Sequence, residues 1–343
     1  MNLGAFVLVC VLLVLDSAFG SSIAPLHIVE YSSSHSYNED LSLVPAPTIE
    51  LSYHMGPLLT SPPERSPLNF HFLWVGTFSP AQKQILVDFA SSFETIINTH
   101  NNNNNNNNEE APIPSVSSWW STATLYTDRT NAHVSSSLSF SSQSSIQLPL
   151  GTTPHHSNTL LTKDHLLALL TSSLSSRALP VDPSGLYFIF TDPSLAVEDF
   201  CVSECGFHDF TPASPATGNR KLPYAWVGNP STQCPGVCAW PFAAPQYGPQ
   251  GFVALRPPNA DVGMDGMVIN MATLLAGMAT NPFHTGYFEG EAGLPSEAVS
   301  VCTGIFGQGA YPGNPGSLLK QQDTGASFNA LGVNGRHYLL PAI

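Results

Sequence analysis

The longest apolar pattern in the chain lies in its last third and predicts a helix. Between Asp265 and His284 the sequence reads MVINMATLLAGMATNPF, and this interval contains no ionisable side chain. Apolar residues recur there at spacings of three and four, which is typical of a helix with one face on a core. We expect the helix to be buried, with five side chains against a sheet: Met267, Met271, Leu274, Leu275 and Met278.

Shorter apolar runs predict strands that alternate with helices. Residues 69–76 read as a largely buried strand, and Ser79-Pro80-Ala81-Gln82 then supplies a capping box and a proline suited to the first turn of a helix reaching about Ile97. A second helix is expected at 163–176, capped by Thr162. Further strands are expected at 118–126, 133–140, 185–192, 222–228 and 338–340.

This order of elements predicts an α/β (or α+β) fold. Apolar strands that alternate with helices favour a mixed β-sheet covered by helices, in a single domain with long Gly/Pro-rich loops. The domain is expected to span 53–343, with a low-complexity asparagine loop at 98–112.

The N-terminus has the pattern of a signal peptide. Residues 1–20 contain an apolar stretch from Ala5 to Leu15 and then Ala18-Phe19-Gly20, a small-residue cleavage pattern. Eleven apolar residues are too few to span a bilayer, although a signal anchor is an alternative. Residues 21–52 are Ser-rich and predict a poorly ordered segment. We therefore expect a protein secreted to the extracellular space, with no membrane insertion after cleavage.

Charge excludes one class of partner. The net charge is −14, from 24 acidic and 10 basic residues, and the basic residues are scattered. Such a chain has no electrostatic footprint for nucleic acid or for an anionic membrane.

The cysteines predict disulfides. Cys201, Cys205, Cys234 and Cys238 form two C-x3-C pairs, and two disulfides among them are the default in an oxidising compartment, with the pairing left open. A four-cysteine zinc site is the alternative. Cys302 would then be unpaired.

No motif indicates a catalytic residue or a cofactor. The chain lacks G-x-S-x-G, H-E-x-x-H, a phosphate-binding loop and a dinucleotide fingerprint. His54 is a candidate ligand, although a structural histidine is the simpler interpretation. His208 follows Cys205 as in a catalytic Cys-His pair, although a disulfide at this cysteine is the simpler interpretation, and His208 is kept as a candidate binding residue. With His284 and loop acids, the two histidines could also serve a metal-dependent hydrolase, an alternative function.

Two further groups are candidate binding residues. Arg256, Asp261 and Asp265 could organise a calcium ion or sugar hydroxyls, although the helix dipole alone explains an acid at Asp265. A carbohydrate-binding module is a further alternative, in which exposed tryptophans would stack on sugars: Trp119, Trp120 or Trp240.

Seven blocks of the sequence, in order from about residue 53 to the end, resemble the EXORDIUM / phosphate-induced protein 1 family of plants. The blocks are Tyr53–Leu59, Pro114–Trp120, Asp199–His208, Leu222–Gly228, Gln233–Pro235, Arg256–Asn259 and Asp265–Val268. The resemblance implies a secreted apoplastic protein linked to brassinosteroid-responsive growth, with no established enzymatic activity. Its partner would be an unknown cell-wall polysaccharide or cell-surface protein.

The predicted long helix departs from that family. Many members carry His-Glu-Leu-Ala-Glu where this chain has Thr273-Leu274-Leu275-Ala276-Gly277. The chain thus resembles the branch that lacks the His-Glu motif, and a binding role is favoured over a catalytic one.

Overall fold

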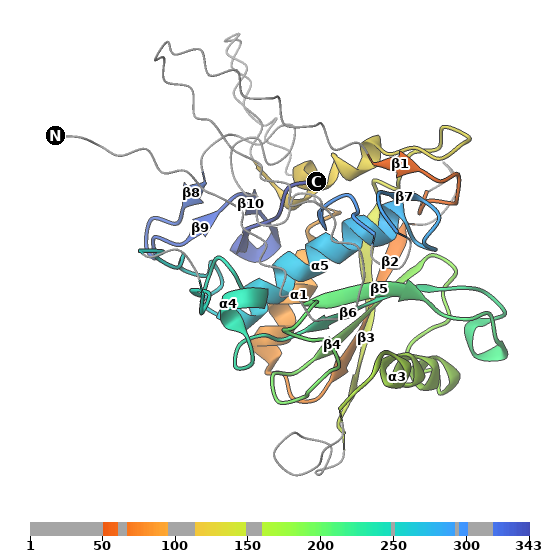
Figure 1. Ribbon diagram of the computed structural model, residues 1–343, viewed down its shortest axis with the longest axis horizontal. Coiled ribbons are helices and arrows are strands. Elements are labelled where there is room, and N and C mark those ends of the chain that lie inside the picture. The colour runs from red at the N-terminus through yellow and green to blue at the C-terminus, as the bar shows by residue number, and fades with distance from the viewer. Residues whose placement is uncertain are drawn as a thin grey trace, which may run out of the picture. The chain divides into compact units, whose positions relative to one another are not determined.

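A five-stranded sheet forms the centre of the computed structural model (Figure 1), which describes residues 51–60, 67–94, 114–148, 160–247, 251–291, 295–300 and 318–343. The strand order is β3-β2-β4-β6-β5. β2, β3, β4 and β6 run parallel, and β5 pairs antiparallel with β6 at one edge. The strands are β2 (Leu68–Val75), β3 (Leu138–Ile146), β4 (Gly185–Thr191), β5 (Gly206–Phe210) and β6 (Pro223–Gly228).

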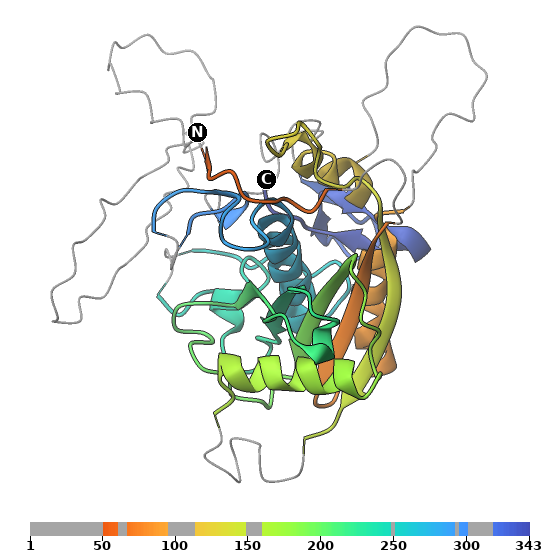
Figure 2. The same cartoon turned by 90° about the vertical axis from the view of Figure 1, so that its right-hand side faces the viewer.

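Helices cover both faces of this sheet, which confirms the predicted α/β class. Figure 2 shows α3 (Lys163–Ser175) on one side and α1 (Pro80–Ser91) and α5 (Val262–Thr280) on the other. Successive residues of β4 alternate between the two layers: Phe188 joins the core under α1 and α5, and Ile189 the core under α3. Both faces are buried, so the parallel strands read as continuous apolar runs rather than alternating ones.

The predicted starts of α1 and α3 are confirmed, but the predicted end of α1 is wrong. Ser79 caps α1 and Thr162 caps α3, each through a capping box. α1 ends at Ser91 rather than near Ile97. The hydroxyls of Ser91 and Ser92 bond back to carbonyls four residues earlier, and the Ser92 N–H bonds to Phe89 O. These bonds tighten the last turn and close the helix.

The predicted strand at 118–126 is wrong. The segment forms α2 (Val116–Trp120) and the short 3-10 helix η1 (Ala123–Leu125). Ser115 and Ser118 form a capping box at the start of α2, so a local polar signal determines the structure of this apolar stretch.

Other predicted strands shift in position. The strand expected at 133–140 becomes β3, which starts at Leu138, and the last strand shortens to β11 (His337–Tyr338). β5 was not predicted. The remaining elements are β1 (Ser52–Tyr53), η2 (Pro215–Thr217), α4 (Pro235–Cys238), β7 (Tyr287–Phe288), β8 (Leu319–Lys320), β9 (Ser327–Phe328), β10 (Ala330–Leu331) and η4 (Val333–Gly335).

The long apolar helix is α5, and it starts earlier than the sequence pattern suggested. Asp261 is its N-cap, and four of the five side chains expected to be buried are fully so, while Leu274 is half-buried. α5 is long and apolar enough to cross a bilayer, but most of it is buried, as in the core helix of a globular domain.

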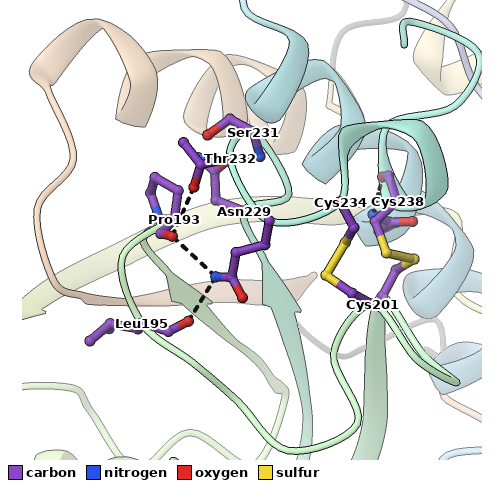
Figure 3. Close-up of a disulfide and its surroundings, with 11 residues drawn as sticks. Pro193, Leu195, Cys201, Asn229, Ser231, Thr232, Cys234 and Cys238 are labelled. Atoms are coloured by element: carbon purple, nitrogen blue, oxygen red, sulfur yellow. Dashed lines mark hydrogen bonds between the residues drawn. A yellow bond between two sulfur atoms is a disulfide. The ribbon is translucent and has the colours of Figure 1, made fainter. Parts of the chain in front are cut away.

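The four cysteines form two disulfides, so the zinc alternative is wrong. Cys201 pairs with Cys234 and Cys205 with Cys238, and Figure 3 shows the first bridge beside Cys238. Both bridges tie the segment leading into β5 to the residues around α4. Among the described residues, no three His, Cys, Asp or Glu side chains gather in a group that could hold a metal ion.

Four predictions fall on residues outside the described ranges. They are the signal peptide at 1–20, the poorly ordered segment at 21–52 apart from its last two residues, the asparagine loop at 98–112 and the unpaired Cys302.

Candidate functional site

A cleft of about 570 Å³ lies where β5 meets α5. We call it the β5–α5 cleft. One wall is β5 with the Cys205–Cys238 disulfide, the other is α5, and Trp240 and Pro341 add apolar surface. The polar side chains that line it are Lys163, Ser203, Glu204, His208, Asp209, Asn270, Thr273, His284, Glu297 and Ser300.

A histidine–carboxylate pair lies in this cleft. His208 Nε2 is 2.7 Å from Glu297 Oε2, and the two side chains are 5% and 12% exposed. Asn281 donates from Nδ2 to the other oxygen, Glu297 Oε1, at 2.7 Å. Asn281 is itself fixed, because its Oδ1 accepts the Gly286 N–H at 2.7 Å. Both oxygens of the Glu297 carboxylate therefore have a protein partner.

The other nitrogen of His208 lacks such a partner within the described part of the chain. His208 Nδ1 is buried and makes no hydrogen bond with any described residue. In the neutral tautomer whose Nε2 donates to Glu297, Nδ1 carries a lone pair and accepts. The His284 ring packs edge-on against His208 at 5.7 Å between centroids, and its Nε2 is 4.0 Å from Asp209 Oδ1.

At the other end of the cleft, Lys163 balances one carboxylate. Lys163 Nζ lies 3.2 Å from Glu204, and its ammonium sits over the Phe207 ring at 4.6 Å. Burial raises the pKa of Glu204, and the neighbouring Lys163 acts in the opposite direction. Since Glu297 and Asp209 also line the cleft, its carboxylates outnumber its permanent cation, which favours ligand groups that donate hydrogen bonds.

Glycine is needed on α5 beside the pair. A Cβ at Gly277 would lie 2.5 Å from Glu297 Oε2 and 3.2 Å from His208 Nε2. The bare helix backbone therefore lets the carboxylate approach. Thr273, Leu274 and Gly277 stand where the family resemblance places His, Glu and Glu, in that order, in many members. Thr273 and Leu274 line the cleft.

The structure brings together two of the three candidate histidines. His208 and His284 meet in the cleft, whereas His54 is not among the residues that line it. The His54 ring stacks on Phe288 at 3.8 Å and bonds to Phe288 O at 3.1 Å. Its contacts account for a structural role.

The predicted role of two tryptophans as surface stacking platforms is wrong. Trp119 is fully buried and Trp120 is 2% exposed. Their indole N–H groups donate to Pro341 O and Ser135 O, which satisfies the only polar atom of each side chain. The third candidate, Trp240, is half-buried and lines the β5–α5 cleft.

The predicted calcium or sugar cluster does not form, because its members make structural bonds. Asp261 caps α5 and accepts from Gln82, and Arg256 donates to Thr324 O at 2.6 Å. Asp265 is 2% exposed, and Asn259 donates to both of its oxygens. Burial raises the pKa of Asp265 to about 7, although those hydrogen bonds act in the opposite direction.

Sequence reasoning missed Glu297 and Asn281. His208 was a candidate because it follows Cys205, but its carboxylate partner lies 89 residues later, in a loop without periodicity. The one available signal was Asn281-Pro282 directly after the helix, where an amide side chain commonly ends a turn.

The fold and site define a disulfide-bonded α/β protein. A cleft lined by both polar and apolar side chains lies at the antiparallel edge of its sheet. No solved structure matches this chain. The conserved region of phosphate-induced protein 1 matches residues 51–343, and the chain belongs to this family.

Several plant proteins are similar to most of this chain and support the family membership. The tobacco protein PHOSPHATE-INDUCED 1 is 40% identical over 295 residues, which cover 85% of this chain and 84% of that protein. Arabidopsis thaliana EXORDIUM is 40% identical over 296 residues, covering 85% of each chain. EXORDIUM-like 2 of the same plant is 40% identical over 305 residues, covering 88% of each.

Proposed function

We propose that this chain is a secreted plant protein of the apoplast that regulates growth in a brassinosteroid-dependent way by binding a partner, without catalysing a reaction. The N-terminal pattern of residues 1–20 supports secretion, and the two disulfides suit an oxidising compartment. Family membership supports the growth role. The partner is a cell-wall component or a cell-surface protein.

The β5–α5 cleft is the binding site in this proposal. The observation that carries it is the state of Glu297, whose two oxygens are both bonded within the chain. A general base needs a group free to take a proton from a bound substrate. On the opposite wall, α5 contributes Ile269, Asn270, Thr273 and Leu274, none of which is ionisable. The cleft therefore offers shape, apolar contact and fixed hydrogen-bonding groups, which suits recognition.

Binding can be tested with a matched pair of threonines. Thr273 lines the cleft and Thr171 lies on α3, and each is half-buried with its hydroxyl bonded to the carbonyl four residues earlier. Thr273→Arg fills the cleft, whereas Thr171→Arg makes the same change elsewhere. We expect labelled protein to bind an isolated cell-wall or plasma-membrane fraction, and Thr273→Arg alone to weaken it at least tenfold. Equal binding by the two variants would remove the cleft from the proposal.

The growth role needs a plant assay. Seedlings that lack the protein should regain their organ length and brassinosteroid response when they express the wild-type chain or Thr171→Arg, but not Thr273→Arg. Secretion is checked in the same plants from the N-terminal sequence of the protein in apoplastic wash fluid, which we expect to begin near Ser21. Retention inside the cell would contradict the apoplastic role.

A hydrolase is the second candidate, and one observation favours it. The unpartnered Nδ1 of His208, backed by Glu297, resembles an imidazole oriented by a carboxylate. Purified protein is assayed on peptide and glycan libraries with His208→Gln as the comparison. Turnover that disappears in this variant would replace the binding proposal with an enzymatic one.

A further inference from the structure

A second cavity, of about 650 Å³, lies between α1 and the C-terminal segment. Its lining comes from four separate stretches: α1, the loop before α5, the turn after β8, and η4 with the residues that follow it. We call it the amide pocket, after the side chains that dominate its polar lining. They are Gln84, Asn259, Gln321 and Asn334, together with the charged pair Asp88 and Arg336.

The charged pair at the base of the pocket is neutral as a unit. Asp88 is 2% exposed, and its Oδ2 accepts from Arg336 Nε at 2.9 Å. Its Oδ1 accepts from Gln84 Nε2 at 2.7 Å and from Asn334 Nδ2 at 2.8 Å. The carboxylate is thus fully bonded, and it cancels the guanidinium charge. A free anion gains little Coulomb energy from such an arginine.

The guanidinium is fixed but not saturated. Arg336 Nη1 donates to Asn259 Oδ1 at 3.3 Å. Asn259 is held in turn by Asp265 and by His337 O, at 2.6 Å and 3.0 Å from its Nδ2. The arginine side chain is 26% exposed, and the described residues bond only its Nε and Nη1. A rigid, planar donor group therefore faces the pocket with N–H groups to spare.

Acceptors lie beside these donors. Gln84 and Asn334 donate their amide N–H groups to Asp88. No described residue bonds their carbonyl oxygens. Asp323 adds a carboxylate at the rim. A ligand with adjacent groups that both donate and accept fits this set, and a sugar hydroxyl does both.

We propose that the amide pocket binds a neutral oligosaccharide, with Arg336 bonded to adjacent hydroxyl oxygens and the Gln84 and Asn334 carbonyls accepting hydroxyl protons. Acidic sugars are disfavoured, because Asp88 already neutralises Arg336, Asp323 lies at the rim and the chain carries a net charge of −14. The proposal rests on the extracellular setting proposed above but not on the β5–α5 cleft.

The experiment measures binding of defined hexasaccharides to the purified full chain by titration calorimetry. The probes are neutral β-1,4-glucan, xylan and mannan hexamers and the acidic hexagalacturonate. We expect at least one neutral hexamer to bind and hexagalacturonate to bind more weakly. Gln84→Met and Arg336→Lys should each weaken the neutral ligand by about fivefold to tenfold, the effect of one lost hydrogen bond.

Two controls separate folding and site effects from this result. Gln322→Met changes an exposed neighbour that does not line the pocket and should bind like the wild type, and thermal melting checks that every variant is folded. The inference is overturned if no neutral hexamer binds, or if hexagalacturonate binds best. It is also overturned if Thr273→Arg abolishes binding while Gln84→Met leaves it intact, a result that would place the glycan in the cleft and leave the proposed function standing.

Discussion

Two cavities of this molecule share one design and differ in one component. In each, an asparagine amide and a basic side chain bond a carboxylate. Asn281 and His208 bond Glu297 in the cleft, and Asn334 and Arg336 bond Asp88 in the amide pocket. A guanidinium carries five N–H donors in one plane, whereas an imidazole has two ring nitrogens. Arg336 therefore keeps N–H groups that no described residue bonds, whereas His208 keeps a single ring nitrogen, Nδ1.

The disulfides should support one cavity and not the other, and their loss should have the largest effect. Cys201→Ser/Cys205→Ser/Cys234→Ser/Cys238→Ser removes both bridges, each across a sequence separation of 33 residues, and Cys205 and Cys238 line the cleft. Chain entropy for one such loop predicts a loss of about 3 to 4 kcal/mol in the free energy of unfolding, and the second bridge adds to it. Urea unfolding measures the loss, and amide hydrogen exchange measures its location. We expect faster exchange in β5 and α4 but unchanged exchange around Asp88. A uniform increase would contradict the claim that the disulfides support the cleft and not the amide pocket.

The ion pair should matter next. Asp88→Ala leaves Arg336 without a carboxylate partner and two amides without an acceptor. The cost should be about 3 kcal/mol, near the low end for buried pairs because the arginine is 26% exposed. The double variant Asp88→Leu/Arg336→Met removes both charges and should recover much of that loss. Denaturant unfolding measures the free energy of unfolding of both variants. A cost below about 1 kcal/mol for the single variant would show that water replaces the pair, as it does on exposed surfaces.

The glycine beside Glu297 sets the third effect. Gly277→Ala should stabilise the helix by about 1 kcal/mol on propensity alone, but its methyl would displace the Glu297 carboxylate. Overpacking costs about 1 to 3 kcal/mol, so the sum is a net loss of about 0 to 2 kcal/mol, and we expect about 1 kcal/mol. The shorter side chain of Glu297→Asp should relieve the clash when combined with it. Thermal melting of the single and double variants is the measurement, and a Gly277→Ala protein as stable as the wild type would mean that the pair moves freely.

The smallest effect concerns pH and the amide pocket. Burial raises the pKa of Asp265 to about 7, with Asp261 adding to the shift while Asn259 and Arg336 oppose it. The folded chain thus keeps a proton that the unfolded chain releases above about pH 4. Stability from this group is full at low pH and is lost as pH rises through about 7.

The expected slope is about 1 kcal/mol less stability between pH 5 and pH 6. Asp265→Asn removes this slope while lowering stability overall, because it cannot accept both Asn259 donors. Burial lowers the pKa of His71, which acts in the opposite direction, but this contribution is common to both proteins and cancels in their difference. Urea unfolding at the two pH values checks the difference, and parallel curves would contradict the Asp265 assignment.

Sequence patterns predicted the elements that have strong local signals. β2, β4 and β6 are apolar runs buried on both faces, and α1 and α3 begin at capping residues, so local chemistry was sufficient. β5 reads GFHDF, too short and too polar to identify, and it is a strand because β6 offers it an edge. α2 was mistaken for a strand because its tryptophans outweighed the serine cap.

The two cavities were less accessible to prediction for the same reason. Each is built from pairs far apart in the chain, such as Asp88 with Arg336 and His208 with Glu297, and no periodicity links such residues. Single members were identified by their chemistry. Their partners became visible only when the fold brought the loops together.

The place of β2 in the sheet has a consequence for how the chain is made. β2 lies between β3 and β4, yet β4 ends at Thr191, well over a hundred residues after Val75 completes β2. At ordinary rates of synthesis this apolar strand waits roughly ten seconds for its second neighbour. During that interval its Phe, Leu and Trp side chains are available to any other exposed strand. Production of this protein should therefore depend on chaperone capacity where the nascent chain emerges, more than its final stability would suggest.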